Sequence, residues 1–214
     1  MNSSQKIKDL KLITFLLGIF RIGFFLLAFS LSIWAIIGIL VLVTNTFTNN
    51  MSFPVMFSLV NEGAFHVSSE LENGMFVIKD AMGIMSSDTL PKSFIALHGL
   101  FTLSINICIL FSIRQIVHIL ESAKTGNFLV VKNAIRLRWI AILGLIILFF
   151  DRLSTLSSAT YFSSKLEYSG LEFNAFNVFS LMEFDTLFIY LFLLVIAEAF
   201  RLGAQLKEEN DLTI

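Results

Sequence analysis

The sequence predicts an all-α membrane protein with four transmembrane helices and a small β-containing extracytoplasmic cap. Of the 214 residues, 56% are hydrophobic and 14% are charged, whereas a soluble domain of this length would carry about 25% charged residues. Four segments are apolar over the roughly 20 residues that a helix needs to cross a bilayer. A long segment with strand-like runs lies between the first two of them, and it predicts the cap.

The first predicted span, residues 22–43, contains no charged residue. The other predicted spans are residues 93–113, 139–160 and 184–200. The basic start of residues 1–21 resembles a signal peptide, but Arg21 interrupts the apolar run and no small-x-small cleavage pattern follows. We therefore expect residues 1–21 to be a retained, amphipathic cytoplasmic lead-in to the first helix.

Lysine and arginine residues near helix ends indicate which side of the membrane is cytoplasmic. With the N-terminus inside, eleven of the 15 Lys and Arg residues lie on the cytoplasmic side. These eleven are Lys6, Lys8, Lys11, Arg21, Arg114, Lys124, Lys132, Arg136, Arg138, Arg201 and Lys207. Both termini are therefore predicted to be cytoplasmic, together with residues 114–138 and 201–214, while residues 44–92 and 161–183 face outward.

The outer segment 44–92 is too long to be a simple connector. Within it, "FHVSSELENGMFVIKD" has two strand-like runs that flank Asn73-Gly74, a strong two-residue hairpin signal because both central positions require positive φ. The preceding run "FPVMFSLV" is a candidate third strand. Residues 161–183 alternate around Gly170 and are candidates to pair with the first loop. An isolated hairpin is marginally stable, so we expect it to lean on the helix ends or on this second loop.

Acidic residues are concentrated in the outer segments. The simpler interpretation is a solvated face from which the topology rule excludes positive charge. The second interpretation is that these residues form a receptor for a cation or a cationic peptide. The residues are Glu62, Glu70, Glu72, Asp80, Asp88, Glu167, Glu172, Glu183 and Asp185.

Polar residues inside the spans are costly in hydrocarbon and are natural candidates for function. His98, Thr102 and Asn106 recur every four residues, so they share one helix face. This stripe is a candidate for ligand binding or proton relay, or it joins helices by hydrogen bonds. Asp151 either pairs with another helix, lies at the interface, or faces inward to meet His98. In a further alternative, the adjacent Arg152 meets Asp185. In the inward position Asp151 is the best candidate for an intramembrane function.

The sequence contains no catalytic or metal-binding pattern of the HExxH, GxSxG or phosphate-loop kind. The one cysteine, Cys108, excludes a disulfide within the chain and is interpreted as a small packing residue. A net charge of −1 gives no indication of nucleic-acid binding. We predict a non-enzymatic protein with no cofactor, no metal and no direct contact with nucleic acid.

The second span is predicted to continue past the membrane as the helix "IRQIVHILESAKTGNF". Gly126-Asn127 predicts its C-cap and a turn, after which a new helix begins around "VVKNAIRLRW". This arrangement is a cytoplasmic helical hairpin whose apolar stripe needs a partner, and the prolonged fourth helix is the nearest one. The positive-inside rule and contact with anionic lipid explain its basic flanks, which are Arg114, Lys124, Lys132, Arg136 and Arg138.

Two segments carry a resemblance to a known family. The hairpin has Gly-x-Phe followed by Asn-Ala-x-x-Leu-Arg, at Gly126, Phe128, Asn133, Ala134, Leu137 and Arg138. The chain ends in Glu-x-Phe-Arg-x-Gly-x-x-Leu and then acidic residues with Asp-Leu-Thr, at Glu198, Phe200, Arg201, Gly203, Leu206, Glu208, Glu209, Asp211, Leu212 and Thr213. In these motifs, in length and in its four helices, the chain resembles the bacterial membrane proteins of domain of unknown function 2975. Many relatives have proline in the turn, so a looser turn is expected here.

The resemblance implies a multi-pass protein of the bacterial inner membrane. Members of this family are often encoded beside a small helix-turn-helix DNA-binding protein, which suggests a membrane partner of a regulator. In the tail, Glu198 and Arg201 at i, i+3 are predicted to pair, and Gly203 to permit close helix contact. "EENDLTI" is expected to add to a basic partner as an extended end. Alternatively, the tail folds back on Arg136 and Arg138.

The predicted function is a non-enzymatic signalling or regulatory module that docks a cytoplasmic partner such as that regulator. Its partner-binding residues are predicted to be Glu198, Arg201, Gly203, Leu206, Glu208, Glu209, Asp211 and Leu212. One alternative is a small transporter or channel subunit, with the His98 stripe and Asp151 lining a path in a homo-oligomer. A second alternative is a membrane scaffold protein.

Overall fold

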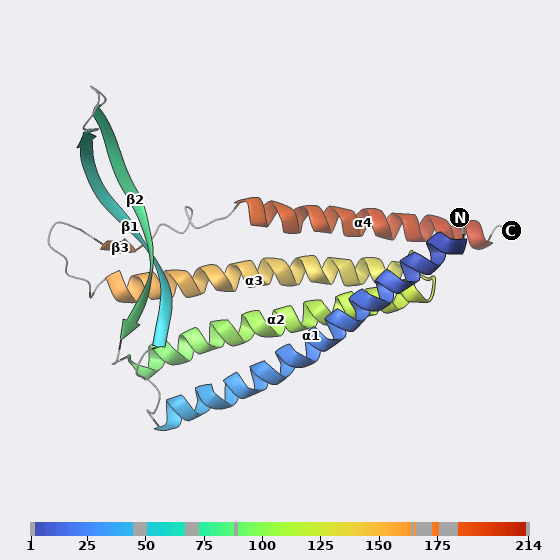
Figure 1. Cartoon of the computed structure of the whole chain (residues 1–214), viewed down its shortest axis with the longest axis horizontal. Coiled ribbons are helices and arrows are strands. Elements are labelled where there is room, and N and C mark those ends of the chain that lie inside the picture. Colours follow the sequence, from blue (N-terminus) through green and yellow to red (C-terminus); the bar gives the residue numbers. More distant parts are fainter. Residues whose placement is uncertain are drawn as a thin grey trace. The chain divides into compact units, whose positions relative to one another are not determined.

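The structure, a computed structural model, describes residues 3–44, 51–66, 73–87, 90–163, 165, 173–175 and 184–212. Within these residues lie four long helices, α1 (Ser3–Thr44), α2 (Lys92–Lys124), α3 (Val131–Ser163) and α4 (Phe184–Leu212) (Figure 1). The strands are β1 (Met51–His66), β2 (Asn73–Ser87) and β3 (Phe173–Ala175). The chain divides into a helical unit (Met1–Ile39, Thr102–Phe150 and Phe184–Ile214) and a sheet-bearing unit (Leu40–Phe101 and Asp151–Glu183).

Each of the four helices is long and apolar enough to cross a membrane. Helices α2 and α3 have 33 residues each and are therefore about 50 Å long, whereas the hydrocarbon core of a bilayer is about 30 Å thick. They extend beyond a bilayer, as the sequence predicts for the hairpin. Helix α1 starts at Ser3, so the predicted lead-in and the first span form one continuous helix.

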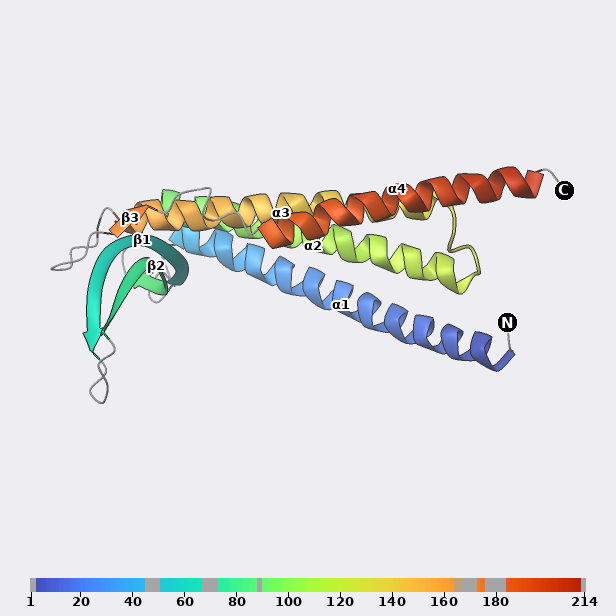
Figure 2. The ribbon, with the colours of Figure 1, turned by 90° about the horizontal axis from the view of Figure 1, so that it is seen from above.

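The start of α1, the end of α4 and the α2–α3 turn lie at the same end of the helical unit, here called the turn end (Figures 1 and 2). An even number of crossings brings both termini to one side of a membrane, which agrees with the predicted topology. That this side is the cytoplasm stays a prediction based on the positive-inside rule.

The sheet has the strand order β2-β1-β3. Strands β1 and β2 form a long antiparallel hairpin that runs from the pair Met51↔Ser87 to the pair His66↔Asn73, and Figure 2 shows its curvature. Strand β3 pairs with Phe57, Ser58 and Leu59 of β1, so the predicted pairing of the second loop with the first is confirmed. The extracytoplasmic position of the sheet stays a prediction.

Two details of the predicted hairpin are wrong. Asn73 and Gly74 do not form the turn, because they are the first residues of β2 and pair with His66 and Phe65. The connection consists of residues 67–72, which lie outside the described residues, as does Gly170. The run "FPVMFSLV" is no separate strand, because the ladder continues past the irregularity between Ser58 and Asn61. A long cross-strand register has overridden the local turn signal.

Aromatic packing holds the sheet-bearing unit together. Phe53 and Val55 of β1, Phe94 of α2 and Phe162 of α3 form its buried core. The ring centroids of Phe53 and Phe94 are 5.1 Å apart and those of Phe94 and Phe162 are 5.8 Å apart, both edge to face. Aromatic quadrupoles favour this arrangement. The hairpin therefore leans on helix ends as well as on the second loop.

Of the predicted acidic outer layer, the structure describes the exposure of the Asp185 side chain, which is exposed. The side chains of the other members lie outside the part whose burial is described. Helix α2 begins directly after Pro91, whose carbonyl oxygen accepts hydrogen bonds from the backbone N–H groups of Phe94 and Ile95. Proline suits the start of a helix, because the N–H group that it lacks would have no carbonyl partner within the helix.

Candidate functional site

A glycine cap ends α2 at the turn end. Gly126 has a φ of +82°, a left-handed conformation that glycine adopts without strain. The N–H of Gly126 donates to the carbonyl of Ala123 at 3.1 Å, and the N–H of Asn127 donates to the carbonyl of Ser122 at 3.0 Å. These two bonds make a Schellman motif. The position of this C-cap and turn is the one that the sequence predicts, whereas a turn looser than that of relatives with proline stays a prediction.

Asn133, at the start of α3, locks this turn. Its side chain is buried; Nδ2 donates to the carbonyl of Phe128 at 2.8 Å, and Oδ1 accepts from Nη1 of Arg136 at 2.8 Å. A buried amide without hydrogen-bond partners would lower the free energy of unfolding by about 1–3 kcal/mol. The carbonyl of Phe128 and the guanidinium of Arg136 supply these partners, so asparagine is suited to this position. Nη1 of Arg136 also donates to the carbonyl of His118 at 3.0 Å, which ties α3 to α2.

Glu198 connects α3 with α4. Its Oε1 accepts from Nε and Nη2 of Arg201 at 2.9 and 2.5 Å, and its Oε2 accepts from Nη2 of Arg138 at 2.5 Å. Charge-assisted bonds of this kind are stronger than neutral ones. The predicted i, i+3 pair of Glu198 with Arg201 is present. The alternative prediction places the tail near Arg136 and Arg138, but it does not name Glu198 as the residue that contacts Arg138. We call Glu198, Arg138 and Arg201 the Glu198 clamp.

Apolar contacts flank the Glu198 clamp. The ring of Phe128, from the turn, meets the ring of Phe200 of α4 edge to face at 5.3 Å. Leu129, also from the turn, lies beside Gly203, where an added Cβ would be 3.9 Å from its Cδ1. This is an ordinary contact, so the close approach predicted for Gly203 is not what requires glycine there. The turn of the hairpin therefore contacts helix α4, whereas a contact of the apolar stripe of α2 with α4 stays a prediction.

The close approach occurs instead at Gly144 of α3. A Cβ at this position would fall within the ring of Tyr190 of α4. Ala141 of α3 and Ala197 and Ala204 of α4 are also almost completely buried. Small residues let membrane helices pack closely. Gly144 therefore permits the close approach of α3 and α4, and the Glu198 clamp closes their contact at the turn end.

Helix α4 continues beyond the Glu198 clamp to Leu212. The extended conformation predicted for "EENDLTI" is therefore wrong for residues 208–212, because the preceding run from Gln205 to Glu209 consists of residue types that favour a helix and carries it onward. The side chains of Leu206, Glu208, Glu209 and Asp211 are exposed. On the other side, Arg138 contacts Glu198, and Arg136 contacts Asn133 and His118. The pair of Arg138 with Glu198 joins the terminal segment to the basic hairpin, as the alternative interpretation expects in part. A contact of the acidic residues beyond Leu206 with this hairpin stays a prediction.

His98 lies in the core of the sheet-bearing unit. Its ring centroid is 4.7 Å from that of Phe53, and the hydroxyl oxygens of Ser154 and Ser158 are 3.4 and 3.5 Å from Nδ1. Contacts of this kind join helices in membrane bundles. His98 thus touches a strand and a neighbouring helix at once.

Asp151 does not meet His98. Its side chain is 57% exposed, and Nε of Arg152 lies 3.9 Å from its carboxylate. In the same stripe as His98, Asn106 donates from Nδ2 to the carbonyl of Thr102 at 2.8 Å, a bond within its own helix. The inward convergence that would favour a polar path is not present among these contacts.

An ion pair joins α1 to α2. Nη2 of Arg21 lies 2.6 Å from Oε1 of Glu121, and Nδ1 of His118 lies 3.1 Å from Oε2 of the same carboxylate. Glu121 lies outside the predicted span 93–113. Hydrogen bonds from Arg21, and then from His118, lower the pKa of Glu121. The sequence does not predict this pair, because one hundred positions separate Arg21 from Glu121.

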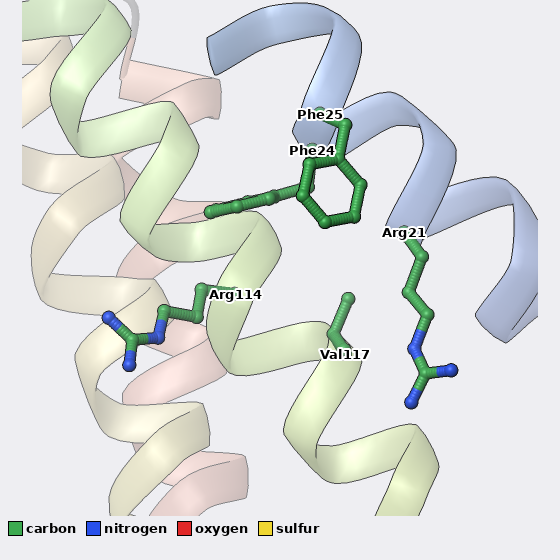
Figure 3. Close-up of a pocket in the computed structure, with 5 residues that line it drawn as sticks. All are labelled: Arg21, Phe24, Phe25, Arg114 and Val117. Carbon is green, nitrogen blue, oxygen red and sulfur yellow. The ribbon is translucent and has the colours of Figure 1, made fainter.

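Beside this ion pair, α1 and α2 border a pocket of about 460 Å³ (Figure 3). Phe24, Phe25 and Val117 form its apolar lining, and Arg21 and Arg114 stand at its edges. Figure 3 shows that the two arginine side chains extend in different directions. They do not converge on one point, so this pocket is an apolar slot and no anion site.

Within the described ranges, no three His, Cys, Asp or Glu side chains are grouped so that they could hold a metal ion. Four helices of this length and apolarity are those of a multi-pass α-helical membrane protein. A family model described as "Protein of unknown function (DUF2975)" matches residues 91–214. The match covers more than half of the chain, so the chain belongs to this family, as its resemblance indicates. Comparisons with curated proteins and with solved structures found no match.

The family match includes α2, α3 and α4 and therefore both motif segments. The structure brings these segments together, since Arg138 and Phe128 of the first contact Glu198 and Phe200 of the second. Gly126 and Asn133 shape the turn that makes these contacts possible. The turn end is consequently the best candidate for the functional site.

Proposed function

We propose that this protein is a non-enzymatic regulatory module of a bacterial inner membrane. The end of α4 docks a cytoplasmic partner, such as a small helix-turn-helix DNA-binding regulator. The proposal combines the topology predicted from charge with the family to which the chain belongs.

The observation that carries the proposal is the exposed helical end of α4. From Glu198 to Leu212 this end is about 20 Å long, and the Glu198 clamp holds its base against α3. Ala204 is buried against the protein, whereas Leu202 and Leu206 are 49% and 62% exposed. Exposed leucines at i, i+4 on a helix suit the apolar groove of a partner.

The charge of this helix end favours a basic partner. The exposed acidic residues beyond Leu206 are Glu208, Glu209 and Asp211. Carboxylates beside an apolar stripe increase the rate of association with a positively charged surface and disfavour negatively charged ones. A DNA-binding protein presents such a basic surface. Docking on α4 would cover it and would compete with DNA.

The test is affinity purification from the native bacterium, with the full chain compared with a chain truncated after Leu206. We expect a small DNA-binding protein to co-purify with the full chain and to be lost on truncation. A sharper variant, Glu208→Lys with Glu209→Lys, reverses the charge without shortening the helix and should also lose the partner. Binding of the co-purified DNA-binding protein to the full chain and to this variant is then measured with the purified proteins.

The matched control is Lys124→Glu, which reverses an exposed charge of the turn end that lies on α2 and not on α4. This control should keep the partner. If the full chain, the truncated chain and both variants recover the same proteins, the end of α4 is not a docking site and the proposal is wrong.

A further inference from the structure

A second pocket, of about 490 Å³, lies between α2 and α3 at the turn end. Its lining includes Phe111, Arg114 and His118 of α2 and Lys132, Arg136 and Trp139 of α3. On each helix these residues are three or four positions apart, which places them on one face. Two facing helix surfaces therefore build this pocket.

The polarity of the pocket changes along its length. The helices are antiparallel, and the hydrogen bond from Arg136 to the carbonyl of His118 shows which residues face each other. Phe111 and Trp139 lie farther from the turn, at the ends of the predicted spans 93–113 and 139–160, and their side chains are 47% and 52% exposed. The cationic residues follow toward the turn. A membrane lipid shows the same change in polarity, from its apolar acyl chains in the bilayer to its polar headgroup at the surface.

The charge of the pocket is positive. Three of its lining residues, Arg114, Lys132 and Arg136, carry fixed positive charges, and no carboxylate is among the lining residues. Glu121, which contacts His118 from beyond the lining, already accepts a hydrogen bond from Arg21 at 2.6 Å. Its negative charge is thus offset by α1, so the pocket keeps its positive potential.

The guanidinium of Arg136 is held in place for an anion. The bonds to Asn133 and to the His118 carbonyl use only Nη1, so Nε and Nη2 keep N–H groups that these bonds do not use. Arg114 extends away from Arg21 of α1 (Figure 3) and lines this second pocket. Arginine presents several N–H donors in a geometry that matches phosphate oxygens.

We propose that this pocket binds an anionic phospholipid. Its phosphate lies among Arg114, Lys132 and Arg136, and its acyl chain lies along Phe111 and Trp139. Basic pockets between transmembrane helices bind phosphate-bearing headgroups in this way, and tryptophan is enriched where helices meet the membrane interface. The apolar end of the pocket favours a lipid over free phosphate. The site is separate from the docking face of α4, so either proposal can fail without the other.

Trp139 provides the reporter for the test. The chain has 2 tryptophan residues, so Trp34→Phe leaves Trp139 as the sole tryptophan, which is excited selectively over tyrosine at long ultraviolet wavelength. The full chain is placed in phosphatidylcholine vesicles that contain phosphatidylglycerol or phosphatidylcholine with brominated chains, and quenching of Trp139 is measured. We expect brominated phosphatidylglycerol to be preferred. One basic residue near an anionic surface contributes about fivefold, so Arg114→Gln with Lys132→Gln should remove most of this preference.

The matched control is Lys124→Gln with Lys207→Gln, which removes the same charge from exposed residues of the turn end outside the pocket. This pair should keep the preference. Equal loss in both pairs would mean that only the general surface potential attracts the lipid, and the proposal would be overturned. No preference in the parent chain would overturn it as well.

Two further measurements keep the test decisive. Millimolar inorganic phosphate should leave the lipid preference unchanged; if phosphate abolishes it, the ligand is free phosphate and the lipid assignment is wrong. Helix content by circular dichroism and elution in gel filtration show whether each variant is folded. If the double variant does not fold, Lys132→Gln alone is used, because Lys132 is exposed and is no part of the bonds around Asn133. It should then lower the preference about fivefold.

Discussion

Helix α1 and the α3–α4 pair contain similar small residues but use them differently. At Gly144 of α3, the ring of Tyr190 occupies the space that a side chain would need. At Gly18, Gly23 and Gly38 of α1, no atom within 4 Å of an added Cβ belongs to another helix or to a side chain beyond the adjacent residues. A glycine in an apolar helix therefore marks a helix contact only where a partner side chain fills the space.

The polar contacts also differ between α1 and the α3–α4 pair. The α3–α4 pair is closed by the Glu198 clamp, in which one carboxylate serves two guanidinium groups. Helix α1 has the ion pair of Arg21 with Glu121, and large apolar side chains such as Phe25 and Phe29 are 70% and 67% exposed. We conclude that α3 and α4 are held by protein contacts, whereas much of the surface of α1 is left to lipid. The predictions below test this comparison.

The largest effect is expected from Gly144→Ala. The new Cβ would overlap the Tyr190 ring, and overpacking of this kind costs about 1–3 kcal/mol in the free energy of unfolding. The measurement is unfolding of the purified protein in mixed micelles. Gly23→Ala in α1 is the matched control and should not destabilise, since its Cβ enters open space. Adding Tyr190→Ala to Gly144→Ala should recover part of the loss; no recovery would mean that the ring is not the cause.

The next effect is expected from Gly126→Ala, which tests the cap that brings the turn to α4. An L-residue in the left-handed conformation is less stable than glycine by about 1 kcal/mol. We expect this fall in the free energy of unfolding in the same assay. Gly18→Ala, in the middle of α1, serves as the control. If Gly126→Ala and Gly18→Ala lower the free energy of unfolding by the same amount, the left-handed cap is not what stabilises this turn.

A smaller effect is expected from Glu198→Gln, which removes the charge shared by Arg138 and Arg201. The Glu198 carboxylate is 43% exposed, so solvent weakens both ion pairs, and we expect a lower Tm than in the parent chain. The difference should shrink at high salt, since salt screens exposed charges. Glu208→Gln changes the net charge equally without touching the clamp and should leave Tm unchanged. An equal shift in both variants would contradict the clamp.

The smallest effect is expected at α1. The pKa of Glu121 is lowered by Arg21 and His118, so its ion pair is complete above the ordinary carboxyl pKa of about 4.3. As the pH falls through the lowered pKa, the carboxylate is protonated and the contribution of the pair to stability is lost. A spin label at Gly18→Cys, in a Cys108→Ala background, should keep its mobility from neutral pH down to the ordinary carboxyl pKa and become more mobile only when the pH falls further, through the lowered pKa of Glu121.

Glu121→Gln should raise the mobility of this label at neutral pH, whereas Glu208→Gln, which changes the net charge equally, should not. If neither acid nor Glu121→Gln changes the mobility, the ion pair does not hold α1, and the comparison would rest on packing alone.

The failures of prediction have a common physical origin. Asn73-Gly74 has the local chemistry of a tight turn, but the two residues pair with His66 and Phe65 in a longer ladder. The end of α4 has acidic and polar residues typical of a tail, yet it stays helical to Leu212. In both places a regular element extends through residues whose local signals indicate an end.

What the sequence by itself determined is local. The apolar lengths specify four helices, because crossing a bilayer requires about 20 consecutive apolar residues. Gly126 specifies the cap, because a left-handed residue is needed within a few positions of the helix end. The i, i+3 spacing specifies the pair of Glu198 with Arg201, because one helical turn brings them together.

The tertiary structure alone decided the contacts between distant residues. Arg138 reaches Glu198 across sixty positions, Tyr190 fills the space beside Gly144, and the faces of α2 and α3 join around a basic pocket. Each contact depends on which helix faces pack together and in which register. Many packings bury nearly the same apolar area, so the choice depends on small residues, shape and paired charges that act together only in the folded chain.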